Sequence, residues 1–225
     1  MSLPAPRAII FDWDNTLVDT WPIIHDALNA TFRDVGLPLW TMQQTQARVR
    51  KSMRDSFPEV FGPDWQKAGE LYQQHYRAHH LHRLTALPQS RELLDLVKGL
   101  GLFNTVVSNK KGVNLRQEVE HIGWAPLFDK VVGAQDAARD KPFCEPVMMA
   151  FENAPLSPGP DVWFFGDSEI DLECAKNTGC TAILYGPLAQ EHPDFNATHY
   201  QGFEYHAYVA SHEDSMQLLR QALGQ

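Results

Sequence analysis

Acidic side chains occur at two places where an apolar run has just ended. Asp12 and Asp14 follow the run at residues 8–11, and Asp167 and Asp171 follow the run at residues 162–165 and a glycine. Carboxylates gathered at one point repel one another, so the arrangement is stable only if a cation neutralises it. Mg²⁺ takes oxygen ligands from one or two carboxylates and completes its shell with water and phosphate oxygens. The pattern therefore predicts a magnesium site for a phosphorylated substrate.

The positions of Asp12 and Asp14 indicate two different roles at such a site. Asp12 is the predicted nucleophile, because a carboxylate that attacks a phosphoryl group forms an aspartyl phosphate. Asp14 is predicted to protonate the leaving oxygen and then to activate water. Lys141 would supply positive charge to the transferring phosphoryl group, and the Ser108 hydroxyl would hold its equatorial oxygens.

The elements that must bring these residues together alternate along the chain. Apolar runs typical of buried parallel strands lie at residues 8–11, 104–107, 130–132, 162–165 and 181–184, with a weaker run at 205–210. Helix patterns lie between them at residues 90–100, 114–122, 145–153 and 170–178. The alternation predicts an α/β fold, a Rossmann-like, doubly wound parallel sheet. Such sheets bind ligands beyond the carboxyl ends of their strands, where the polar residues described above are expected to converge.

Residues 20–87 interrupt this alternation, because they contain no strand-like run. Three helices are expected there, at residues 22–35, 41–54 and 64–82. Thr41 followed by Gln44 fits a capping box at the start of the second helix. We therefore predict a core formed by residues 1–19 and 88–225 and an inserted α-helical cap domain formed by residues 20–87.

Four short motifs resemble those of the haloacid dehalogenase superfamily, and they occur in the expected order and spacing. The motifs are Asp12-Trp13-Asp14-Asn15-Thr16, Ser108-Asn109-Lys110, Lys141-Pro142 and Gly166-Asp167-Ser168-Glu169-Ile170-Asp171. The helical insertion is similar to the cap of subfamily I members such as phosphoglycolate phosphatases and beta-phosphoglucomutases. The position after Asp14 is usually Gly in the superfamily and is Asn15 here, a residue that also tolerates unusual backbone angles.

The resemblance implies a magnesium-dependent phosphatase that is phosphoglycolate phosphatase-like and hydrolyses a small phosphate monoester of the phosphoglycolate or sugar-phosphate type. It implies Asp12 as the nucleophile, Asp14 as the acid and base, and Ser108 and Lys141 as residues that hold the phosphate.

The resemblance also implies the magnesium ligands, which are the Asp12 side chain, the Asp14 backbone carbonyl and Asp167. Asp171 is expected to act as a ligand directly or through water. Within the same motifs, Thr16 and Asn109 are the predicted substrate contacts.

The expected cap contains a basic stretch and several histidines. Helical spacing places Arg50 and Arg54 on one side of the predicted helix, so these two are the predicted substrate contacts from the cap, with Lys51 a weaker third and a solvated helix face as the alternative. His75 and His79 have the spacing of a metal pair. They lack an acidic or thiol partner nearby in the sequence, so exposed side chains are the preferred interpretation.

The motifs leave other activities open. A phosphomutase would pass the same aspartyl phosphate to a second hydroxyl, and a phosphonatase would need a cap lysine such as Lys51 to form a Schiff base. A dehalogenase is disfavoured because that chemistry uses no magnesium and lacks an acid at the position of Asp14. A non-catalytic binding module would have lost its nucleophile or acid, and both are present here.

Composition limits the partners and the location. The 225 residues carry a formal net charge of -9 and no basic run, which argues against nucleic-acid binding. The first residues lack the layout of a signal peptide, and no stretch is long enough to cross a membrane. Three cysteines without metal-type spacing fit reduced thiols in a cytoplasmic protein. The expected partner is a small phosphorylated metabolite, and the protein is expected to be a monomer or homodimer.

Overall fold

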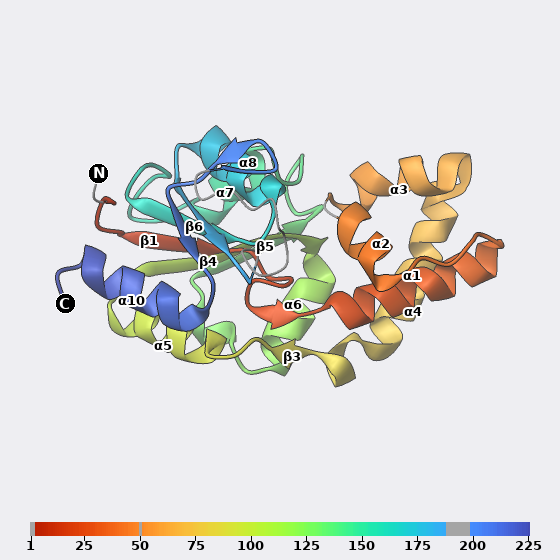
Figure 1. Ribbon diagram of the computed structural model, residues 1–225, viewed down its shortest axis with the longest axis horizontal. Helices are drawn as coiled ribbons and strands as arrows, with labels where there is room; N and C mark the ends of the chain where they lie inside the picture. The colour runs from red at the N-terminus through yellow and green to blue at the C-terminus, as the bar shows by residue number, and fades with distance from the viewer. Residues whose placement is uncertain (1–2, 50, 188–198) are drawn as a thin grey trace.

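A parallel sheet forms the centre of the protein in a computed structural model, which describes residues 3–49, 51–187 and 199–225 (Figure 1). Its strand order is β10-β7-β6-β1-β4-β5, and all neighbouring strands run parallel. The strands are β1 (Ala8–Phe11), β4 (Phe103–Lys111), β5 (Lys130–Ala134), β6 (Val162–Gly166), β7 (Thr181–Tyr185) and β10 (Ala207–Val209). This sheet confirms the predicted α/β fold class.

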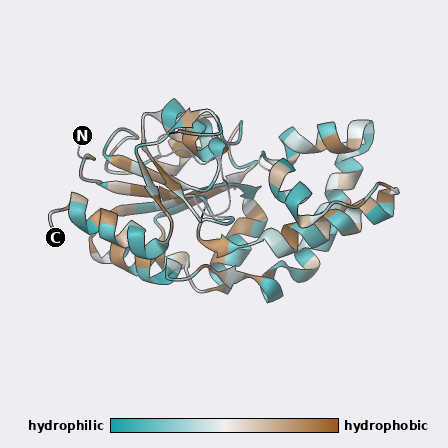
Figure 2. Cartoon of the chain, viewed as in Figure 1, coloured by the Kyte–Doolittle hydropathy of each residue, from teal (hydrophilic) through white to brown (hydrophobic). Residues whose placement is uncertain are grey.

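Helices cover both faces of the sheet, which explains why its strands are continuously apolar. They are α5 (Ser90–Gly99), α6 (Gly112–His121) and α10 (His212–Ala222) on one face and α7 (Glu145–Ala150) and α8 (Glu169–Thr178) on the other. In β1, Ile9 and Phe11 contribute to one core and Ala8 and Ile10 to the other, as the two-residue period of a strand requires. Figure 2 shows hydrophobic residues concentrated in the central strands and alternating with polar ones along the helices.

The register of the sheet places the ends of its central strands side by side. Phe11 of β1 pairs with Val106 of β4 and with Phe165 of β6. The residues that follow these three positions therefore emerge at one edge of the sheet. β4 continues through Lys111, four residues beyond the predicted strand, so Ser108 lies within it rather than in a loop after it.

A group of helices lies beyond this edge of the sheet (Figure 1). They are α1 (Trp21–Val35), α2 (Met42–Arg48), α3 (Met53–Phe61) and α4 (Trp65–Arg83). The group has a core of its own, which includes Ile23, Leu28, Phe32 and Phe57. The chain enters and leaves this group through the antiparallel strands β2 (Val18–Asp19) and β3 (Thr85–Ala86). The expectation that residues 20–87 contain no strand is therefore wrong for β3, near the end of this segment.

The predicted helix at residues 41–54 is divided in two. Thr41 does form the expected capping box with Gln44, whose backbone N–H donates to the Thr41 hydroxyl oxygen at 3.2 Å. α2 then ends, because Val49 is extended with φ −92° and ψ 93°. Ser52 begins α3 and donates its hydroxyl to Asp55 at 2.8 Å.

This break removes the argument that Arg50 and Arg54 share one side of a helix. Arg54 lies in α3, in a different helix from the residues before the break, and Arg50 lies outside the described residues.

Short elements complete the described structure. They are the 3-10 helices η1 (Gly62–Asp64) and η2 (Ala125–Leu127) and the antiparallel strands β8 (His199–Tyr200) and β9 (Phe203–Glu204). Among the described residues, no helix is both long and apolar enough to cross a membrane.

Gly133 of β5 offers a test of the packing behind the site edge. A Cβ at this position would lie 2.5 Å from Gly112 Cα and 2.7 Å from the Lys110 carbonyl oxygen, and backbone atoms cannot move aside easily. We expect Gly133→Ala to lower the free energy of unfolding by about 1–3 kcal/mol, as overpacking commonly does. Urea denaturation would measure it.

Gly99 provides the control, because a Cβ there would meet nothing within 4 Å. Gly99→Ala should leave the free energy of unfolding unchanged or raise it slightly. Equal losses in the two variants would contradict the packing argument.

Candidate active site

Carboxylates from two segments of the chain meet at the edge of the sheet. Asp12 directly follows β1, Asp167 directly follows β6, and Asp171 lies in the first turn of α8. Each offers an oxygen atom within 4.8 Å of the others, a spacing that suits a shared metal ion. The donors are all carboxylate oxygens, which favour Mg²⁺ over metals that prefer nitrogen or sulfur.

Asp12 is buried and held through one of its oxygens. Its Oδ1 accepts hydrogen bonds from the Trp13 backbone N–H at 2.7 Å and from Lys141 Nζ at 2.9 Å. Burial raises the pKa of Asp12 to about 7; the charge of Lys141 opposes this rise, and the charges of Asp171 and Asp14 add to it. Because negative charge is costly here, a divalent cation would stabilise the site.

Lys141 joins two of these carboxylates. Its side chain is only 2% exposed, and its Nζ lies 2.6 Å from Asp171 Oδ1 as well as close to Asp12. Burial lowers the pKa of Lys141, but the charges of Asp12 and Asp171 outweigh burial and raise it overall. The other Asp171 oxygen accepts from the backbone N–H and the hydroxyl of Ser168. Both oxygens of Asp171 are therefore engaged. This arrangement suits a carboxylate that orients Lys141 or contacts a metal ion through water better than one that binds the metal directly.

Glycine is needed where β6 approaches α8. A Cβ at Gly166 would overlap the Asp171 side chain, so the close approach of strand and helix depends on its absence.

Asp14 is positioned by a tight turn after β1. Asn15 has φ 58°, in the left-handed region, so it takes the backbone conformation that glycine adopts readily, as expected. The Asp14 Oδ1 atom accepts a hydrogen bond from the Thr20 hydroxyl at 2.6 Å and forms an ion pair with Lys110 Nζ. These contacts fix Asp14 beside the other carboxylates.

The remaining predicted residues of the core motifs lie at the same edge. Ser108 is buried, and its hydroxyl oxygen accepts from the Lys110 backbone N–H at 3.2 Å. The Asn109 side-chain amide donates to the Lys141 carbonyl oxygen at 3.0 Å, and the Thr16 hydroxyl donates to Asp167 at 3.4 Å. The structure thus brings the four motifs together.

A cavity separates this edge from the inserted helices. Its lining includes Asp12, Asp14 and Ser108 from the core and Phe57 and Tyr72 from the helices. Arg54 also lines the cavity, and its Nε lies 2.7 Å from Asp140 Oδ2, one residue before Lys141. Arg54 is therefore near the site, in contact with the core.

The burial of Glu118 and His80 near this site was not predicted from the sequence. Glu118 belongs to a helix pattern in which a glutamate usually faces solvent, yet its side chain is fully buried. The spacing of the buried residues Asn114, Leu115, Glu118 and Val119 marks one helix face, which is the signal that could have indicated its burial. Of the histidines, His80 is buried beside Glu118, and His75 Nε2 lies 2.6 Å from Asp34 Oδ2.

Comparison with known proteins places this fold and site in a class. The family described as "Haloacid dehalogenase-like hydrolase" matches residues 9–185. The chain therefore belongs to the haloacid dehalogenase-like hydrolases, which confirms the resemblance and the prediction of an enzyme.

Two curated relatives are similar over most of their length. One is "Phosphoglycolate phosphatase" from Chromobacterium violaceum, 28% identical over 195 residues, which span 83% of this chain and 87% of the relative. The other is "N-acetylmuramic acid 6-phosphate phosphatase" from Pseudomonas aeruginosa, 27% identical over 201 residues, which span 86% of this chain and 87% of the relative.

Solved structures agree with the fold. A hydrolase of this superfamily from Ehrlichia chaffeensis has a TM-score of 0.65 and 26% identity, covering 99% of this chain and 100% of its own. A haloacid dehalogenase-like family hydrolase from Streptococcus pneumoniae has a TM-score of 0.77, with 95% and 98% coverage, and at 19% identity it shows the fold alone.

The raised pKa of Asp12 predicts an unusual effect on stability. Its folded pKa of about 7 lies above the unfolded value, so ionised Asp12 destabilises the metal-free protein above pH 7, and this cost disappears as the pH falls towards 4. Without divalent ions at pH 8, Asp12→Asn should be more stable than the wild type by on the order of 2–4 kcal/mol. Urea denaturation between pH 5 and 8 would measure the gap.

The control for this prediction is Asp95→Asn, which removes the same charge from an exposed position. It should change stability little at any pH. If the difference in stability between Asp12→Asn and the wild type did not shrink with falling pH, the raised pKa of Asp12 would be contradicted.

Proposed function

We propose that this protein is a magnesium-dependent phosphatase that hydrolyses a small phosphate monoester of the phosphoglycolate or sugar-phosphate type through an aspartyl phosphate on Asp12. The observation that carries the proposal is the meeting of Asp12 with Asp167 and Lys141 at one edge of the sheet, where Asp12, Asp14 and Asp167 line a cavity. The names of the two curated relatives, a phosphoglycolate phosphatase and an N-acetylmuramic acid 6-phosphate phosphatase, support a small phosphate monoester as substrate.

The oxygen donors at this edge suit a magnesium ion. In the proposal, Asp12, the Asp14 backbone carbonyl and Asp167 hold it, and Asp171 acts through water. When bound, the ion would neutralise the carboxylates and polarise the phosphoryl oxygens.

The first step divides its tasks among residues of the core. Asp12 Oδ2 attacks phosphorus, since Oδ1 is already occupied by Trp13 and Lys141. The bond between phosphorus and the leaving oxygen breaks, and protonated Asp14 gives its proton to that oxygen. Lys141 and the Ser108 hydroxyl stabilise the charge on the transferring phosphoryl group.

The second step regenerates the enzyme. Asp14, now a carboxylate, takes a proton from a water molecule, whose oxygen attacks the phosphorus of the aspartyl phosphate. The bond between phosphorus and Asp12 breaks, inorganic phosphate leaves, and Asp14 is protonated again.

The inserted helices would determine which substrate reacts. In the proposal residues 20–87 form a cap whose closure excludes water, and the leaving group lies in the cavity against α3 and α4. Thr16, Asn109, Arg54 and Arg50 remain the proposed substrate contacts. We also propose a cytoplasmic monomer or homodimer, a location supported by cysteines that form no disulfide.

Loss of the nucleophile is the main test. Asp12→Asn should reduce phosphate release from a panel of phosphoglycolate, sugar phosphates and nucleoside monophosphates by about 10⁴-fold or more. EDTA should abolish the wild-type activity, and added Mg²⁺ should restore it. A phosphate-release assay beside the Asp95→Asn control measures both effects, and activity that survives Asp12→Asn would disprove the mechanism.

Arg54 can be tested through the two kinetic constants. Loss of a charged substrate contact costs about 1.5–3 kcal/mol, so Arg54→Ala should raise KM about tenfold or more and change kcat less. Steady-state kinetics with the best substrate of the panel would measure the changes in KM and kcat separately. Arg33→Ala, at an exposed position of α1, is the matched control. Unchanged constants in Arg54→Ala would remove this residue from the substrate site.

A further inference from the structure

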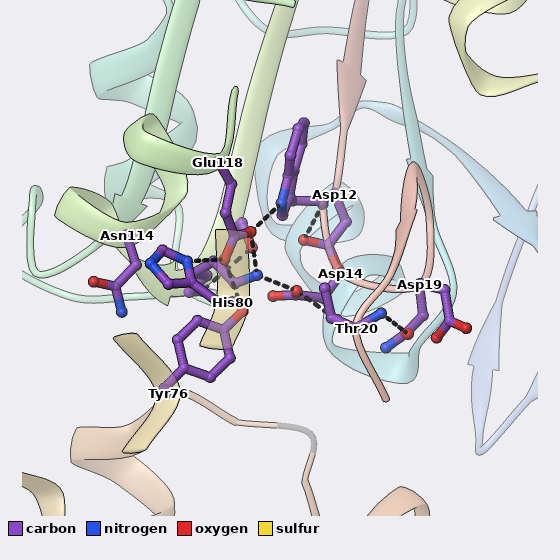
Figure 3. A network of polar contacts seen from close by, with 12 residues as sticks. Asp12, Asp14, Asp19, Thr20, Tyr76, His80, Asn114 and Glu118 are labelled. Carbon is purple, nitrogen blue, oxygen red and sulfur yellow. Dashed lines mark hydrogen bonds and ion pairs between the residues drawn. The ribbon is translucent and has the colours of Figure 1, made fainter. Parts of the chain in front are cut away.

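Glu118 is a buried charge in the last turn of α6. Its side chain is 0% exposed, and an isolated carboxylate in such a place would be strongly destabilising. Four donors surround it: Trp13 Nε1, Lys110 Nζ, the Tyr76 hydroxyl and His80 Nδ1. Figure 3 shows these contacts converging on its carboxylate from three parts of the chain.

The two oxygens of Glu118 face different parts of the protein. Oε2 accepts from Trp13 Nε1 at 2.7 Å and from Lys110 Nζ at 2.6 Å, both on the side of the turn after β1. Oε1 lies 2.8 Å from the Tyr76 hydroxyl and 2.8 Å from His80 Nδ1, both in α4. One carboxylate therefore connects the catalytic edge of the core to an inserted helix.

Glu118 reaches the turn that carries the proposed nucleophile and acid at two points. It binds Trp13, the residue between Asp12 and Asp14, directly. It reaches Asp14 through Lys110, whose Nζ is shared between Glu118 Oε2 and Asp14 Oδ1. A lysine side chain has a flexible four-carbon stem, so a second anionic partner restricts where its ammonium group can lie.

The carboxylate of Glu118 is a fixed charge. Burial raises its pKa, but the charge of Lys110 and the hydrogen bonds from His80, Lys110 and Tyr76 outweigh burial and lower the pKa to about 2. Glu118 therefore carries no proton to donate near neutral pH. Its role must be exerted through the groups that it holds.

We propose that Glu118 is a positioning residue that fixes Asp14 through Lys110, and that Tyr76 and His80 make this positioning depend on α4 lying against α6. The inference rests on the proposed function, in which Asp14 protonates the leaving oxygen. An error of about 1 Å in the placement of a catalytic group can cost 10²-fold in rate. The contacts of Glu118 prevent such an error.

The leaving group separates this role from a merely structural one. An alkyl phosphate releases a strongly basic alkoxide, which needs the proton from Asp14, whereas p-nitrophenyl phosphate releases a weakly basic phenolate that needs it far less. The value of kcat/KM reports the steps up to departure of this group. A misplaced Asp14 slows the alkyl phosphate selectively, and a generally damaged site slows both substrates equally.

Glu118→Gln is the variant of choice because it preserves shape and removes the charge. Its amide oxygen can still accept from Lys110 and Trp13 if the amide nitrogen faces Tyr76 and His80, which can both accept a hydrogen bond. We expect kcat/KM for the best alkyl phosphate to fall about tenfold more than kcat/KM for p-nitrophenyl phosphate. Glu120→Gln, at an exposed position of the same helix, should leave both values unchanged.

Tyr76→Phe keeps the experiment decisive if Glu118→Gln does not fold, which thermal unfolding would reveal. It removes one donor to Oε1 and keeps the ring, whose centroid lies 5.2 Å from Lys110 Nζ. We expect a smaller fall in kcat/KM than in Glu118→Gln. This fall should again be larger for the alkyl phosphate than for p-nitrophenyl phosphate.

The possible results distinguish the two proposals. Equal losses on both substrates, or no loss, in folded variants of an active enzyme would overturn the role of Glu118 and leave the phosphatase proposal intact. A wild-type enzyme that hydrolyses neither substrate with Mg²⁺ would overturn the proposed function and this inference with it.

Discussion

The concentration of negative charge at one edge of the sheet is the constraint on which the site depends. Carboxylates that would repel one another lie within a few ångströms, in a place where water screens them poorly. Two buried lysines offset this cost in the same manner. Lys141 lies between Asp12 and Asp171, and Lys110 lies between Asp14 and the buried glutamate of α6. Each lysine thus links a proposed catalytic carboxylate to a second carboxylate that orients it.

The parallel sheet makes this arrangement possible because it delivers several strand ends to one place. The pairing of Phe11 with Val106 and with Phe165 sets the positions of the acidic residues that follow. β4 is longer than its neighbours and carries Ser108 and Lys110, in a stretch where its register against β5 shifts between Val107 and Lys111. The glycines behind this edge allow strand and helix to approach closely, so the charged groups rest on closely packed structure.

The sequence allowed the sheet and the core motifs to be predicted, because strands buried on both faces are continuously apolar and their polar ends stand out. It did not reveal the break between α2 and α3, since the basic residues there continue a helical pattern and Ser52, which precedes α3, is a weak sign of a new helix. The burial of Glu118 and His80 was also missed. A glutamate or histidine in a helix is usually solvated. Burial of Glu118 depends on partners far away in the sequence, Trp13 and Tyr76, and burial of His80 depends on Glu118 itself.

In the proposed closure of the cap, the short ribbon formed by β2 and β3 would limit how the inserted helices move. The two crossings of the chain are hydrogen-bonded to each other, with Val18 opposite Ala86 and Asp19 opposite Thr85. Bending the ribbon out of its plane breaks no pairing, whereas sliding one crossing past the other breaks all of it. The ribbon would therefore act as a hinge with one preferred axis of rotation. Because Thr20 directly follows this ribbon and bonds to Asp14, rotation about that axis would shift the side chain of Asp14, the proposed acid.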